Sequence, residues 1–166
     1  VGLPWHICES ATAKMDFDIS GGTYKVTIIS PGGRSRGGED RWDCQFRHRG
    51  LKMRTSDTYT LHFELTADQS GMFYTKIGNL NGDVEVWHNG NKDSSDFGQK
   101  WDCIQVQAGQ TYSMDCTFQP TKDVDVAEWT FQFGGDGEYT PHDCFPEGTT
   151  LTFDNMSLIN ESRDDD

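Results

Sequence analysis

Short runs in which apolar and polar residues alternate constrain the fold of this chain more than any other feature of its sequence. In a β-strand, successive side chains point to opposite faces, so this alternation is typical of a strand with one buried face and one face in water. Glycine-containing pairs such as Gly21-Gly22 and Asn81-Gly82 interrupt the runs where tight turns are needed. The clearest runs lie at residues 24–29, 42–46, 59–65, 72–77, 84–87, 104–106, 112–114, 129–133 and 151–153. Their regular spacing predicts an all-β fold, a β-sandwich of the jelly-roll type with two antiparallel sheets.

The length of the chain fits one such domain. Its 166 residues can bury a sizeable core, and aromatic residues make up 12% of the sequence, which is too many for a chain that never collapses. Both ends read as excision points in a longer polypeptide, and the acidic C-terminal run is typical of a linker. We therefore predict one domain over residues 1–160 and the start of an acidic linker at residues 161–166.

The charge of the chain excludes some classes of partner. There are 14 basic and 27 acidic residues, which give a formal net charge of −13. Such a surface repels phosphate backbones and anionic lipid, and no apolar run is long enough to span a membrane. We expect no nucleic-acid or membrane partner, whereas a neutral polymer would not be repelled. Acidity also keeps a secreted domain soluble, which explains the charge equally well.

Motifs that carry catalysis are missing from the sequence. It contains no Gly-x-Ser-x-Gly elbow, no P-loop and no His-Glu-x-x-His segment. Carboxylates are so abundant that a pair at glycosidase spacing could be placed in any sandwich, so their presence alone indicates nothing. We therefore predict that the chain is not an enzyme, and keep a glycoside-cleaving domain as a less favoured alternative.

Five cysteines form an odd set, so at least one is unpaired within the chain. Cys44 lies between Trp42 and Phe46 in a strand pattern and is predicted to be a buried thiol. Cys8 and Cys144 lie near opposite ends of the chain, which often meet in a sandwich, and they are the first choice for a disulfide. Each also belongs to a His-x-Cys pair, but structural zinc sites usually have longer spacings, so zinc is less favoured.

Asp154 follows the last strong strand run and precedes Asn155. Oxygen ligands from loops suit calcium, and capping of a turn explains the same residue equally well. We carry Asp154 forward as a candidate structural calcium ligand and expect no required cofactor.

A protein site for a neutral sugar chain needs surface aromatic rings, which stack on the C–H face of the sugar. It also needs amide, carboxylate or guanidinium groups, which bind the hydroxyl rim. Trp42 shares strand parity with Cys44 and is therefore predicted to lie in the core. The opposite face of that strand carries Gln45 and Arg47 in a polar row, which is suited to hydroxyl groups or is simply a solvated face.

Two further tryptophans are candidates for an exposed platform. Trp87 has the opposite parity to Val84 and Val86 and precedes a turn, which predicts that it faces solvent. Trp129 is ambiguous, because Val126 and Phe131 have opposite parity and a β-bulge must separate them. A shift before Trp129 would place this residue in the core, and a shift after it would expose it.

Several segments resemble carbohydrate-binding modules attached to clostridial and ruminal cellulases. They are GLPWHICE at 2–9, RWDCQFRHRGL at 41–51, YTKIGN at 74–79, WTFQFG at 129–134, CFPEG at 144–148 and FDN at 153–155. The likeness covers nearly the whole chain and is broadly to jelly-roll modules of families 4, 9 and 22, with family 79 of cellulosomal family 9 endoglucanases as the nearest suggestion. The broader group often has calcium near its termini, but the opening of this chain lacks the acidic pattern expected for it.

This resemblance implies a secreted, monomeric module of a bacterial cellulosome, linked to a catalytic domain and binding β-1,4- and mixed-linkage β-glucans. Xyloglucan is a further candidate ligand. It implies ligand contacts on the strand that holds Trp129 and Gln132 and on the strand around Gln45. Our sequence hypothesis is therefore a non-catalytic binding module. Trp87 and Trp129 would stack on pyranose rings, and the polar or flanking contacts would be Gln132, Gln45, Arg47 and Tyr74. The rival hypothesis is a structural or protein-interaction β-sandwich of a multidomain cellulase.

Overall fold

The protein is represented by a computed structural model that describes residues 5–89, 103–139 and 143–162. Almost all regular structure in these residues is β-strand, and two single turns of 3-10 helix precede β4. No helix in the described ranges is long and apolar enough to cross a membrane. In chain order the elements are β1 (Trp5–Glu9), β2 (Ala13–Ser20), β3 (Thr23–Pro31), η1 (Arg34–Arg36), η2 (Arg41–Asp43), β4 (Cys44–Met53), β5 (Tyr59–Ala67), β6 (Gly71–Asn79), β7 (Glu85–His88), β8 (Ile104–Val106), β9 (Thr111–Phe118), β10 (Val124–Gln132) and β11 (Thr150–Asn160).

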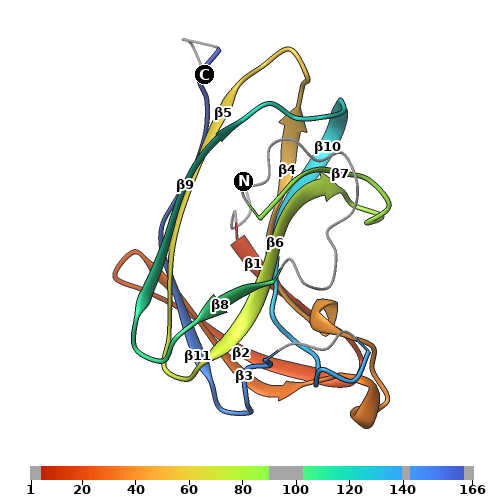
Figure 1. The fold of residues 1–166 in the computed structure, drawn as a ribbon, viewed down its shortest axis with the longest axis vertical. Helices are drawn as coiled ribbons and strands as arrows, with labels where there is room; N and C mark the ends of the chain where they lie inside the picture. Colours follow the sequence, from red (N-terminus) through yellow and green to blue (C-terminus); the bar gives the residue numbers. More distant parts are fainter. Residues whose placement is uncertain (1–4, 90–102, 140–142, 163–166) are drawn as a thin grey trace.

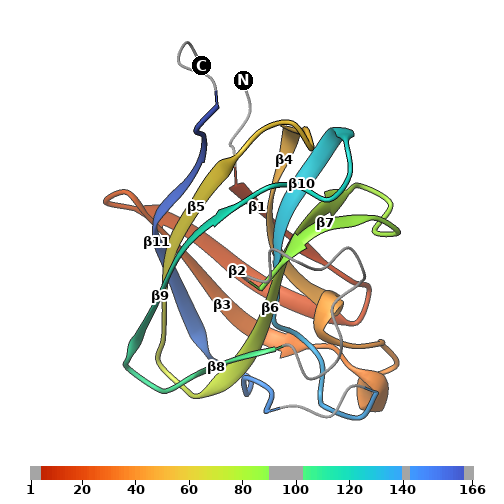
Figure 2. The ribbon, with the colours of Figure 1, turned by 45° about the horizontal axis from the view of Figure 1, so that its top comes forward.

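The described strands form two antiparallel sheets that face each other (Figure 1). Sheet A has the order β1-β4-β10-β6-β7, with β8 paired to β6, and sheet B has the order β2-β3-β11-β5-β9. Figure 2 shows sheet B, with β5, β9 and β11, on the opposite side of the molecule from β4, β10 and β6 of sheet A. Neighbours in the sheets are mostly not neighbours in the sequence, as in a jelly roll. The predicted all-β sandwich of two antiparallel sheets is confirmed.

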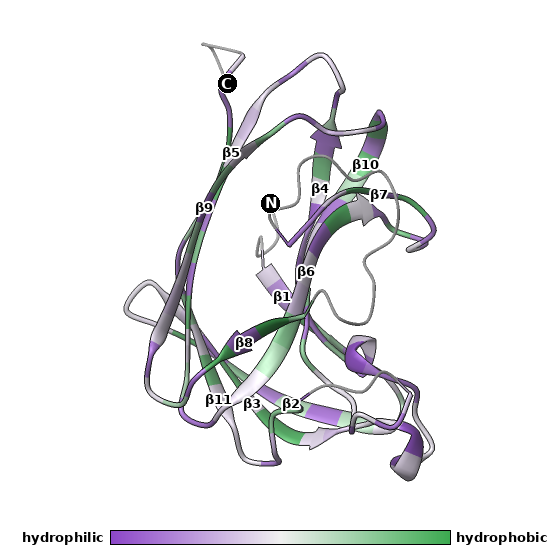
Figure 3. Ribbon diagram, in the orientation of Figure 1, coloured by the Kyte–Doolittle hydropathy of each residue, from purple (hydrophilic) through white to green (hydrophobic). Residues whose placement is uncertain are grey.

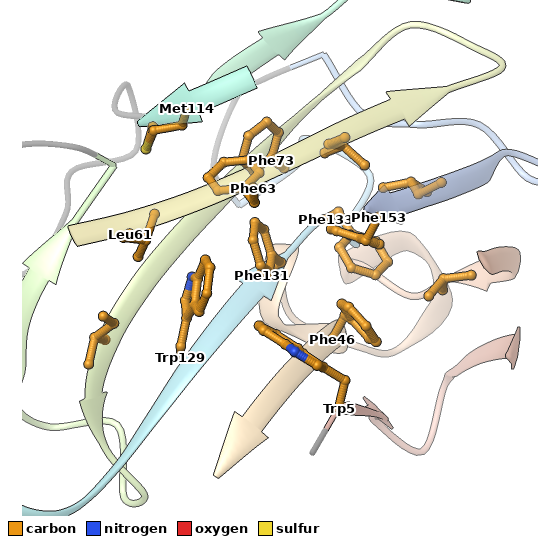
Figure 4. Packing of buried hydrophobic residues seen from close by; sticks show 14 of the residues in the cluster. Trp5, Phe46, Leu61, Phe63, Phe73, Met114, Trp129, Phe131, Phe133 and Phe153 are labelled. Atoms are coloured by element: carbon orange, nitrogen blue, oxygen red, sulfur yellow. The ribbon is translucent and has the colours of Figure 1, made fainter. Parts of the chain in front are cut away.

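Aromatic rings from both sheets fill the space between them. Phe131 of β10 lies 4.9 Å from Phe63 of sheet B and 5.0 Å from Phe153, measured between ring centroids. Figure 4 shows these rings together with Phe46 and Trp129 in one packed layer. Hydropathy alternates along the strands that carry them, so each strand gives one face to the core (Figure 3). Burying one such side chain contributes roughly 1.5–3 kcal/mol.

Trp129 belongs to this core, so its predicted role as a ligand contact is wrong. The pairing of β10 with β4 shifts between Val124 and Ala127 and again between Ala127 and Glu128, both before Trp129. The indole is only 2% exposed, and its N–H donates to the Thr75 hydroxyl at 2.9 Å. Because the shift in register precedes Trp129, its side chain falls on the core face of the strand, which is the first of the two alternatives left open by the sequence.

Trp87 is buried as well, against the prediction that it faces solvent. The pairing of β6 with β7 shifts between Ile77 and Gly78, and Trp87 pairs with Ile77, which points into the core. Its indole lies 5.5 Å from the Phe118 ring of sheet B. All positions of β7 are buried, so the parity of Val86 could not indicate which face was open.

Trp42, predicted to be in the core, is only half-buried. The strand begins at Cys44, and Trp42 lies in the preceding turn η2, where strand parity does not apply. The prediction for Cys44 itself is confirmed, because its thiol is fully buried and burial raises its pKa to about 12.

The predicted Cys8–Cys144 disulfide is not formed, because Cys8 is a free thiol. His142, which would complete the second His-x-Cys pair, lies outside the described residues. At the C-terminal boundary, the Glu161 amide donates to the Thr58 carbonyl at 2.7 Å, and the Thr58 amide donates to the Ser162 hydroxyl at 2.9 Å. The chain is therefore still attached to sheet B at residue 162, and a linker start at 161 stays a prediction.

These positions predict a stability contrast between two tryptophans. Trp129→Ala should lower the free energy of unfolding by about 3–5 kcal/mol, because it opens a cavity among core rings. Trp42→Ala, in a half-buried turn, should lower it by far less. Chemical denaturation followed by circular dichroism measures both. Equal losses for the two variants would contradict this assignment of core and surface.

Candidate functional site

A groove of about 410 Å³ crosses the outer face of sheet A. The groove begins beside η2, passes over β4, β10 and β6, and ends at the turn that follows β6. This turn contains the Asn81-Gly82 pair that the sequence marked as a break. The lining residues are Trp42, Gln45, Arg47, Lys76, Leu80, Asn81, Gly82, Glu128 and Gln132.

Strand register brings the polar floor of this groove together. On β10, Phe131 points into the core, so the neighbouring Gln132 and Thr130 point outward. Gln132 pairs with Gln45 of β4, and Thr130 lies between Arg47 of β4 and Lys76 of β6. Because these pairs are directly opposite across antiparallel strands, their side chains are close neighbours on one face.

Charges on the floor occur in opposite pairs. Glu128 is 5% exposed, and its carboxylate lies 3.3 Å from the Arg49 guanidinium and 3.9 Å from that of Arg47. The Lys76 ammonium lies 3.7 Å from the Glu85 carboxylate. Paired charges present hydrogen-bond donors and acceptors without a strong field of one sign, so the floor suits a neutral polar ligand better than a polyanion.

The two predicted polar contacts on β4 are held in place by neighbours. The Gln45 amide donates to the Trp42 carbonyl at 2.9 Å and accepts from the Thr130 hydroxyl at 3.0 Å. The Arg47 Nε–H donates to His6 Nε2 at 3.2 Å. Burial, together with the nearby arginines, lowers the pKa of His6, which keeps its ring neutral and able to accept this bond.

Trp42 supplies the aromatic ring at one end of the groove. Its indole N–H donates to the Glu39 carboxylate at 3.2 Å. The loop that leads to η2 is tied down by the Asp43 carboxylate, which accepts from the Gly33 amide at 2.8 Å and the Glu39 amide at 2.7 Å. Gly32 is required in this loop, because a Cβ there would lie 2.6 Å from the Asp43 carboxylate and its φ is +74°.

Tyr74 faces the correct side of sheet A but has no surface for a ligand. It pairs with Gln132 on β10 and is fully buried. Its hydroxyl donates to the Glu85 carboxylate at 2.5 Å, and the Arg41 guanidinium lies 4.4 Å from its ring centroid. The prediction of direct contact is therefore wrong, and Tyr74 instead supports the charged groups beneath the groove.

The structure thus places Gln45, Arg47 and Gln132 in one groove, and the tryptophan beside them is Trp42 rather than Trp87 or Trp129. Ligand contact by these residues stays a prediction. Sequence reasoning missed Glu128 and Lys76, although their strand parity matches that of Gln132 and Tyr74 and could have indicated them. Of the remaining tryptophans, Trp5 is 5% exposed in the core, and Trp101 lies outside the described residues.

A second hollow, of about 460 Å³, opens at one end of the sandwich between β4, β10 and β11. Trp5 lines it, but this ring is stacked on Phe46 at 4.8 Å and meets Trp129 edge-on at 5.0 Å, so its faces are already occupied. Asp154 also lines it and accepts from the Asn155 amide at 2.8 Å. Within the described ranges no three His, Cys, Asp or Glu side chains converge on a metal position. Calcium at Asp154 stays a prediction.

The chain is similar to part of a cellulose 1,4-β-cellobiosidase of Acetivibrio thermocellus. The two are 31% identical over 161 residues, which cover 90% of this chain but only 16% of the cellobiosidase. A scan against profiles of known protein families gives no match. The chain therefore corresponds to one segment of a much longer relative.

Several solved structures with the same fold are carbohydrate-binding modules. A family 4 module superimposes with a TM-score of 0.66 at 20% identity, over 95% of this chain and 86% of the module. The N-terminal cellulose-binding domain of a Cellulomonas fimi β-1,4-glucanase gives 0.60 at 16% identity, over 95% and 88%. A family 11 module of a cellulosomal cellulase from Clostridium thermocellum gives 0.53 at 13% identity, over 96% and 89%. The fold of the chain is the jelly roll of these modules.

Glu128→Gln tests the charge pairing on the floor. The variant keeps the shape of the side chain but leaves the Arg47 and Arg49 guanidinium groups without their counter-charge, so it should lower the free energy of unfolding by about 1–3 kcal/mol. Asp125→Asn is the matched control, because Asp125 pairs with Arg54 at the surface, where its side chain is 83% exposed and its loss should be nearly neutral. Thermal unfolding of both variants measures the difference, and an unchanged Glu128→Gln protein would contradict the pairing.

Proposed function

We propose that this chain is a non-catalytic carbohydrate-binding module that binds single β-1,4- or mixed-linkage β-glucan chains in the groove of sheet A. The observation that carries the proposal is the floor of paired charges and glutamine amides with Trp42 at its end. Sugar hydroxyls need both donors and acceptors, and the Gln45 and Gln132 amides provide both. A Trp ring supplies the apolar surface for the C–H face of a pyranose.

The relatives support the setting of this activity. The chain matches 16% of a cellulose 1,4-β-cellobiosidase, and one structural neighbour is a module of a cellulosomal cellulase. We therefore propose that the chain is secreted and linked to a glycoside hydrolase. Holding that enzyme on its polymer raises the local substrate concentration without any bond being made or broken. Membership of a cellulosome, a monomeric state and family 79 character belong to the same proposal.

A structural spacer packed against a catalytic domain is the rival function. Such a spacer would need an apolar docking patch. The outer face of sheet A instead carries paired charges and amides, which favours a hydrophilic ligand. Glycoside cleavage is disfavoured because Glu128 and Glu85, the carboxylates beneath the groove, are each committed to a cationic partner.

The isolated chain should bind soluble β-glucan and release no sugar from it. Affinity electrophoresis in gels with barley-type β-glucan, hydroxyethyl cellulose, xyloglucan, xylan or mannan should retard the protein in the first two. Trp42→Ala should weaken this binding about thirtyfold, because loss of an aromatic anchor commonly costs about 2 kcal/mol. Ile159→Ala, at a 53% exposed position of sheet B, is the control and should bind normally. Steady release of reducing ends, or full binding by Trp42→Ala, would refute the proposal.

Salt dependence distinguishes a neutral ligand from a charged one. Because glucan is uncharged and the groove charges are paired, the dissociation constant should change little between low salt and about 1 M salt. Titration calorimetry at the two ionic strengths measures it. A steep loss of affinity at high salt would instead point to an acidic or basic polymer.

A further inference from the structure

Tyr139 stands beside Trp42, just outside the residues that line the groove. The two ring centroids are 5.9 Å apart, with planes at 76°. Tyr139 is 52% exposed and takes no part in the core between the sheets. Large apolar side chains this exposed are common singly, but an aromatic pair in edge contact at the end of a polar groove is a more specific arrangement.

The loop that carries Tyr139 is held against η1. The Asp136 carboxylate accepts from the Ser35 amide at 2.7 Å and also from the Ser35 hydroxyl, and it accepts from the Glu138 amide at 3.0 Å. These bonds to the charged form, above all the one from the Ser35 hydroxyl, lower the pKa of Asp136 to about 2, so the carboxylate is charged and can accept them at neutral pH. Tyr139 is therefore attached to the same loop region that positions Trp42.

Arg34 fixes the ring of Tyr139 further. Its guanidinium carbon lies 4.3 Å from the ring centroid, within the range of a cation–π contact. Arg34 is itself exposed, so its guanidinium is accessible to a ligand that lies beside the ring. A ring that is already ordered loses little conformational entropy when a ligand covers it.

We infer that Tyr139 extends the groove by one binding position, where a further pyranose of the same glucan chain contacts the Tyr139 ring and its hydroxyls bind Arg34. The Trp42 and Tyr139 ring centroids are 5.9 Å apart with planes at 76°, so a glucan chain that stacks on Trp42 passes close to Tyr139 and can contact that ring as it leaves the groove. This inference rests on the proposed function of the groove. It predicts that Tyr139 affects only ligands long enough to leave the groove beyond Trp42.

Cello-oligosaccharides of increasing length test the inference by titration calorimetry. The unmodified protein should gain affinity with length until the chain reaches Tyr139. Tyr139→Ala should bind the short oligosaccharides normally and lose about tenfold in affinity for the long ones. Tyr139→Phe keeps the ring and should keep most of the gain, and Ile159→Ala serves again as the exposed control.

The outcomes separate the two proposals. If the unmodified protein binds no cello-oligosaccharide, the groove function itself fails. If Tyr139→Ala keeps the full gain with length, Tyr139 is not a binding position, although the groove function stands. An equal loss at every length would show that Tyr139 only supports Trp42, which also overturns the inference. Thermal unfolding of each variant confirms that the comparison is between folded proteins.

Discussion

The register of β10 decides which side chains of sheet A enter the core and which face the groove. This strand pairs with β4 on one side and β6 on the other. A one-residue shift of β10 would therefore turn its core-facing side chains outward and change the side chains next to them on both neighbouring strands. The irregular pairing around Ala127 sets that parity just before Trp129. From there Trp129 and Phe131 point inward, and Glu128 and Gln132 point outward. The register of β10 therefore determines both the hydrophobic core and the candidate ligand floor.

The charged side chains on the outer face of sheet A lie next to the hydrophobic core and are shielded from water. Glu128, Lys76 and Glu85 are all nearly buried, and a buried charge without a partner is costly. Each therefore has an opposite charge within 4 Å. The pairing that makes these groups tolerable also weakens their field at the groove. This explains how a chain with a net charge of −13 can offer a neutral polymer a floor without a dominant charge.

The alternation of apolar and polar residues predicted most of the fold, and it also placed Gln45 and Arg47 on one face. Gln132, which lines the same groove, was predicted from the family resemblance. The same rule failed for Trp87, because β7 is covered on both faces and its parity gives no contrast. It failed for Trp42 because that residue lies in a 3-10 turn rather than a strand. Periodicity reports which residues share a face. It cannot report whether a face is covered by another segment, or where a strand begins.

The position of an aromatic residue in this fold, in the core or at the surface, therefore depends on whether a strand or a loop carries it. Rings on strands β10 and β7 are taken by the core, since sheet A and sheet B approach closely there. A ring available to a ligand has to come from a loop, where it would be mobile unless something fixes it. Asp43 and Asp136 fix the two loops beside the groove by accepting backbone N–H bonds. From the sequence alone, acidic residues such as these are explained as a solvated surface, but here they order the loops that carry Trp42 and Tyr139. A ring that is already ordered loses little conformational entropy on binding, so these loop aromatics can serve as binding positions.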